Sequence, residues 1–80
     1  MKSKLERLEE KAQRARKKYK RVRDERIEKL DIFNYATPSN FDRLYRKYMR
    51  AIRKEERAEY YAQVAEEKYG MAKGSTEIAE

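Results

Sequence analysis

Seven basic side chains between residues 41 and 69 are spaced so that they could bind a polyanion. They lie one or three positions apart, and at about 100° per residue this spacing puts them on one third of a helix surface. Five of the seven are arginines, whose planar guanidinium makes paired hydrogen bonds to phosphate. The spacing predicts a phosphate-binding stripe about 21 Å long at 1.5 Å per residue. Its members are Arg43, Arg46, Lys47, Arg50, Arg53, Lys54 and Arg57.

A second basic run precedes this stripe. Seven of the ten residues from 14 to 23 are basic and none is acidic. We expect four of them, Arg14, Lys17, Lys18 and Arg21, to extend the phosphate-binding surface. An ordinary solvated face is the alternative, because lysine and arginine also cover apolar seams with their methylene stems. Such a face would usually pair its cations with acids three or four residues away, and these are scarce in the stripe.

The composition argues against catalysis. Cysteine and histidine are absent, which removes thiolate nucleophiles, imidazole bases and the usual zinc ligands. The glutamates fall on long predicted helices, with no pocket to raise a carboxyl pKa. We therefore expect a protein that is not an enzyme and that binds no metal and no cofactor.

Two apolar seams define the elements that position the basic residues. In each seam the apolar residues recur at alternating steps of three and four, as in a coiled coil. The first seam contains Leu5, Leu8, Ala12, Ala15, Tyr19, Val22, Ile27 and Leu30. The second contains Phe41, Leu44, Tyr48, Ala51, Ala58, Ala62, Ala65 and Tyr69, with Glu55 as its one break.

The seams predict an all-α, coiled-coil-like hairpin of two long antiparallel helices over residues 1–70. We expect helix 1 at about 3–31, a connection at 32–38 and helix 2 at about 39–69, since a short connection makes neighbouring helices antiparallel. Gly70 suggests a C-cap, and we expect residues 71–80 to form a flexible tail. Tyr19 should then lie opposite Glu55 and donate a hydrogen bond to it. Ile32, Phe33 and Tyr35 are expected to cover the turn.

Helix 2 also carries a second apolar stripe beside its seam. Leu, Ile, Val and Phe together number only 12 of 80 residues, so an isolated hairpin of this composition has a thin core. We expect the stripe to be a protein interface, through a homodimer that forms a four-helix bundle or through a larger protein partner. The stripe consists of Tyr45, Met49, Ile52, Tyr60 and Val64.

Charge favours a nucleic-acid ligand. The net charge is +7, and residues 11–57 alone carry +10. We expect binding to the backbone of DNA or RNA, largely without sequence specificity. The competing prediction is a protein-interaction module, such as a small regulator, an inhibitor or an accessory subunit of a larger nucleoprotein complex. No membrane role is expected, because tryptophan is absent and the apolar faces are rich in alanine. An intracellular place, cytoplasmic or nucleoid-associated, fits both predictions.

Overall fold

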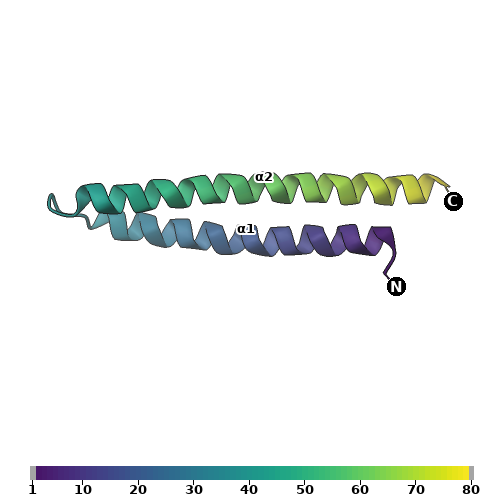
Figure 1. The fold of residues 1–80 in the computed structure, drawn as a ribbon, viewed down its shortest axis with the longest axis horizontal. Helices are drawn as coiled ribbons and strands as arrows, with labels where there is room; N and C mark the ends of the chain where they lie inside the picture. The colour runs from purple at the N-terminus through teal and green to yellow at the C-terminus, as the bar shows by residue number, and fades with distance from the viewer. Residues whose placement is uncertain (1, 80) are drawn as a thin grey trace.

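The chain folds into two helices that lie side by side. The computed structural model describes the backbone of residues 2–79 and the side chains of residues 2–74. Helix α1 (Lys4–Asn34) and helix α2 (Phe41–Ala79) run antiparallel, so that both termini lie at the end opposite the turn (Figure 1). The rod measures 63 × 20 × 13 Å. The predicted all-α helical hairpin is confirmed.

The connection between the helices lies slightly later in the chain than predicted. At the start of α1, the side-chain oxygen of Ser3 accepts a hydrogen bond of 3.1 Å from the Glu6 N–H, which satisfies a donor that the first helical turn leaves free. Helix α1 continues three residues past its predicted end, to Asn34. Helix α2 begins after Asn40, whose side-chain oxygen accepts from the Thr37 N–H at 2.7 Å. The connection is therefore residues 35–40.

At its other end, α2 differs more from the expectation. It runs through Gly70 and Gly74 to Ala79, so no helix end lies at Tyr69 and residues 71–79 are helical. Neither glycine has a positive φ, the conformation that a glycine C-cap adopts. The residues between the glycines, Met71 to Lys73, are good helix formers that offset the cost of glycine. Residue 80 of the predicted tail lies outside the described residues.

The helices pack through very small side chains. Six of the side chains in residues 2–74 are buried, all of them belong to the two predicted seams, and none is larger than valine. Leucines of the same seams are only half-buried. The narrow contact lets the helices approach closely but buries little apolar surface. Its buried residues are Ala12, Val22, Ala51, Ala58, Ala62 and Ala65.

Aromatic rings close the hairpin beside the turn. The Phe33 ring lies 5.2 Å from that of Phe41 and 5.8 Å from those of both Tyr45 and Tyr48, measured between centroids. Phe33 thus packs at the end of the hairpin as predicted. The other two members of the predicted cover stay largely exposed, at 41% for Ile32 and 85% for Tyr35.

Replacing the helical glycines should strengthen the end of α2. A Cβ added at Gly70 or Gly74 meets no atom within 4 Å, and alanine is favoured over glycine in a helix by about 0.5–1 kcal/mol. We expect Gly70→Ala and Gly74→Ala each to stabilise the last turns by about that amount. Far-UV circular dichroism should show greater helix content and a later loss of it on heating. A loss of helix content would mean that the helix ends at Gly70 after all.

Candidate nucleic-acid interface

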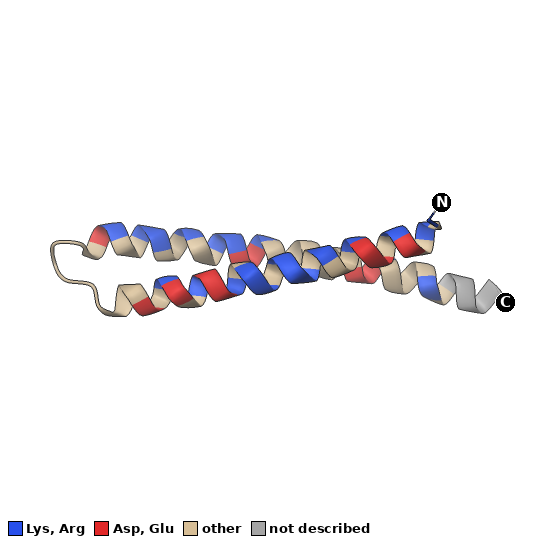
Figure 2. Cartoon of the chain, turned by 90° about the horizontal axis from the view of Figure 1, so that it is seen from below, with Lys and Arg blue, Asp and Glu red and all other residues tan. Residues whose placement is uncertain are grey.

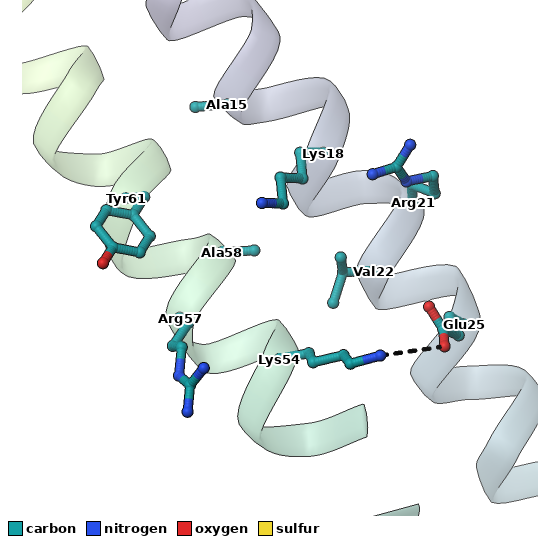
Figure 3. Close-up of a pocket in the computed structure, with 9 residues that line it drawn as sticks. All are labelled: Ala15, Lys18, Arg21, Val22, Glu25, Lys54, Arg57, Ala58 and Tyr61. Atoms are coloured by element: carbon teal, nitrogen blue, oxygen red, sulfur yellow. Dashed lines mark ion pairs between the residues drawn. The ribbon is translucent and has the colours of Figure 1, made fainter. Parts of the chain in front are cut away.

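A groove between the helices brings basic residues of α1 and α2 onto one broad side of the rod. Alanine and valine side chains form its floor, and lysines and arginines of both helices form its walls. The α1 residues that line it are Ala15, Lys18, Arg21, Val22 and Glu25, and the α2 residues are Lys54, Arg57, Ala58 and Tyr61 (Figure 3).

The four cations of this stretch take different directions. Lys18 extends toward α2, and Lys54 extends toward α1 (Figure 3). The Lys54 Nζ lies 4.0 Å from the Glu25 carboxylate, a weak ion pair between exposed groups. Arg21 lies over α1, whereas Arg57 extends from the side of α2 that faces away from α1 (Figure 3). Three of the four thus form no ion pair among the described residues.

The groove continues toward the turn with the same character. Glu25, Lys29, Lys47, Arg50, Ala51 and Lys54 line this next stretch. We call the two stretches together the basic groove. Its charged residues are one acid, Glu25, and seven bases, Lys18, Arg21, Lys29, Lys47, Arg50, Lys54 and Arg57.

On the opposite broad side of the rod, bases and acids are more nearly balanced. Arg16 and Lys18 are separated by about 160° around α1 at 100° per residue, so their side chains face different sides. The hollow beside Arg16 has three bases from α1 and two acids from α2, namely Arg16, Lys20, Arg23, Glu59 and Glu66. Arg16 Nε donates to Glu66 Oε1 at 2.7 Å across it. Of these two sides, the groove side therefore carries the larger excess of positive charge.

The structure divides the eleven predicted phosphate-binding residues into three groups. All eleven are exposed. Six line the basic groove, namely Lys18, Arg21, Lys47, Arg50, Lys54 and Arg57. Arg46 and Arg53 lie beside Tyr45 and Met49 on the outer side of α2. The remaining three line neither the basic groove nor the hollow beside Tyr45 and Met49. They are Arg14, Lys17 and Arg43. The lysines and arginines of α2 gather in its half nearest the turn (Figure 2).

Sequence analysis missed three residues of the groove. Glu25 and Lys29 follow Lys18 at seven and eleven positions, a spacing that keeps all three within about 40° on a helix. This spacing could have identified Lys29 from the sequence, but the denser basic run at residues 14–23 drew attention away from it. Tyr61 carries no comparable signal, since it belongs to neither apolar stripe.

The predicted protein interface is partly exposed. Tyr45 is 46% and Tyr60 62% exposed, whereas Met49, Ile52 and Val64 are half-buried.

The carboxylate that breaks the α2 seam has a different partner from the one predicted. Glu55 accepts a hydrogen bond from the Arg26 guanidinium and not from Tyr19. The side chains of Arg26 and Glu55 are 26% and 16% exposed. Their hydrogen bond raises the pKa of Arg26, with Tyr48 adding to the effect. The pairing differs because α1 ends later and α2 begins later than predicted, and because long side chains lean toward the N-terminus of their own helix.

Removing the charge of Glu55 should destabilise the hairpin. Glu55→Gln leaves the partly buried Arg26 without its anion, and we expect a fall in Tm of about 8 °C. The matched control is Glu66→Gln, the same change at an exposed pair, which should cost less than about 4 °C. Tyr19→Phe should leave Tm unchanged. Equal effects of the two glutamine variants in thermal unfolding would contradict a special role for the Arg26 pair.

Within the described residues, no helix is long and apolar enough to cross a membrane, and no three His, Cys, Asp or Glu residues cluster as metal ligands would. Comparison with known proteins found no matching family model, no matching curated protein and no matching solved structure.

Proposed function

We propose that the protein binds the sugar-phosphate backbone of nucleic acid through the basic groove. One observation carries the proposal: seven bases and a single acid from two helices line one continuous groove. Rows of cations with few acids among them attract a polyanion over its whole length and release its counterions on binding. The action is non-enzymatic and belongs inside the cell, in the cytoplasm or at a nucleoid.

The dimensions of the groove suit several phosphates. From Lys47 to Tyr61 it follows α2 for about 21 Å at 1.5 Å per residue. Phosphates of one strand recur about every 3.4 Å along a duplex, so the groove spans roughly six of them. The arginines can hold two phosphate oxygens each, and the lysines serve as mobile point charges.

Recognition of base sequence is not part of the proposal. Asparagine and glutamine are the side chains that read adenine by paired hydrogen bonds, and neither type lines the basic groove among the described residues. Gln63 lies in the hollow on the opposite side. Binding should therefore depend on salt much more than on sequence.

Charge reversal in the groove tests the proposal. The variant carries Arg50→Glu, Lys54→Glu and Arg57→Glu, and the matched control carries Arg16→Glu, Lys20→Glu and Arg23→Glu, three bases of the hollow on the opposite side. Each reversal lowers the charge by two, so both variants fall from +7 to +1. Fluorescence anisotropy with labelled duplex DNA, single-stranded DNA and duplex RNA would give affinities at low and near-physiological salt. We expect the groove variant to lose at least about tenfold more affinity than the control.

Two results would count against backbone binding in the groove. Equal losses in the two variants would show that only the net charge matters. Binding seen only at very low salt would show a generic polycation, and the predicted protein-interaction role would then be the better proposal. Circular dichroism of both variants verifies that the hairpin remains folded.

A further inference from the structure

Two neighbouring tyrosines of α2 stand exposed beside the basic groove. Tyr60 is 62% and Tyr61 63% exposed, although aromatic side chains gain most from burial. Their ring centroids lie 5.7 Å apart with an interplanar angle of 66°. In such an edge-to-face pair, one ring presents its edge to one face of the other. At least three of the four ring faces therefore stay free of the partner ring.

The tyrosine pair is continuous with the basic groove. Tyr61 and Arg57 line both the groove and the adjoining hollow that holds Tyr60. The same hollow contains Arg53 and one acid, Glu56. A chain whose phosphates follow the groove therefore passes directly beside two aromatic rings. Tyr61 lies on the α2 side of the groove (Figure 3).

We infer that Tyr60 and Tyr61 form a stacking site for unpaired bases, and that the preferred ligand is a single strand. This inference rests on the proposed backbone binding. Bases in a duplex stack on one another and cannot offer their faces, whereas bases of a single strand can stack on aromatic side chains. Stacking accepts any base, because every base has a π face. The site therefore adds a preference for single strands without adding sequence specificity.

An abasic strand separates base stacking from phosphate binding. The probes are labelled thymidine and uridine strands of about 12 nucleotides, an abasic strand with the same number of phosphates, and a duplex of the same length. Anisotropy at near-physiological salt should show thymidine or uridine strands bound about tenfold more tightly than the abasic strand. The duplex, whose bases are already stacked on one another, should bind less tightly than the thymidine or uridine strand. Comparison of the first two probes distinguishes DNA from RNA as the source.

Tyrosine variants locate the effect. Tyr60→Leu with Tyr61→Leu removes the aromatic faces and keeps an apolar side chain, so the preference for the base-containing strand should disappear while abasic binding stays within about twofold. Tyr35→Leu is the matched control, since Tyr35 is 85% exposed in the connection away from the groove. Tyr61→Phe and Tyr60→Phe should retain the preference, because phenylalanine also stacks.

The outcomes separate this inference from the function on which it rests. Equal binding of base-containing and abasic strands, with the groove reversal still effective, would overturn the stacking site and leave backbone binding intact. A preference that survives the leucine variants would also overturn it. Absence of salt-dependent binding to every probe would overturn both.

Discussion

Close contact between small side chains is the constraint on which the rest of the structure depends. Buried alanines bring α1 and α2 together along a narrow line, with Val22 as the largest buried side chain. Because that line is narrow, the residues that flank it on both sides stand at the surface. The floor of the basic groove is therefore apolar and shallow, and its walls carry charged side chains from two helices. A seam of leucines would push the helices apart and separate the two rows of cations.

The charges on the two broad sides of the rod have different effects on the contact between the helices. On one side, bases of α1 face acids of α2, and pairs such as Arg16 with Glu66 link the helices. On the other side, bases face bases across the groove, with Glu25 as the one acid. Like charges in a row destabilise a compact state by mutual repulsion, so the unpaired cations of this side work against the stability of the free protein. A polyanion bound there as proposed would relieve the repulsion and hold both helices at once, which would couple ligand binding to folding stability.

Sequence periodicity was sufficient for the architecture because both seams repeat over many turns. All six residues that are buried in the described part of the chain lie at predicted seam positions, and the helix that carries the basic stripe was predicted correctly. Local features were less predictable. Glycine is ambiguous, since it caps a helix only when its φ is positive, and Gly70 instead stays helical. The partner of Glu55 depended on the bounds of the connection, where a shift of two or three residues moves every cross-helix contact. The groove needed the structure, because its walls combine residues more than 20 positions apart in the chain.

The aromatic cluster at the turn gives the hairpin a direction of assembly. Among the described ring pairs that join α1 to α2, Phe33 and Phe41 are the closest in sequence, and closing a short loop costs less chain entropy than closing a long one. Once those rings are in contact, each further turn of α1 can pack against α2 without the closure of another long loop. We therefore expect folding to proceed from the turn toward the termini. On that basis, alterations in the cluster should slow folding, whereas alterations near Leu5 should act mainly on the rate of unfolding.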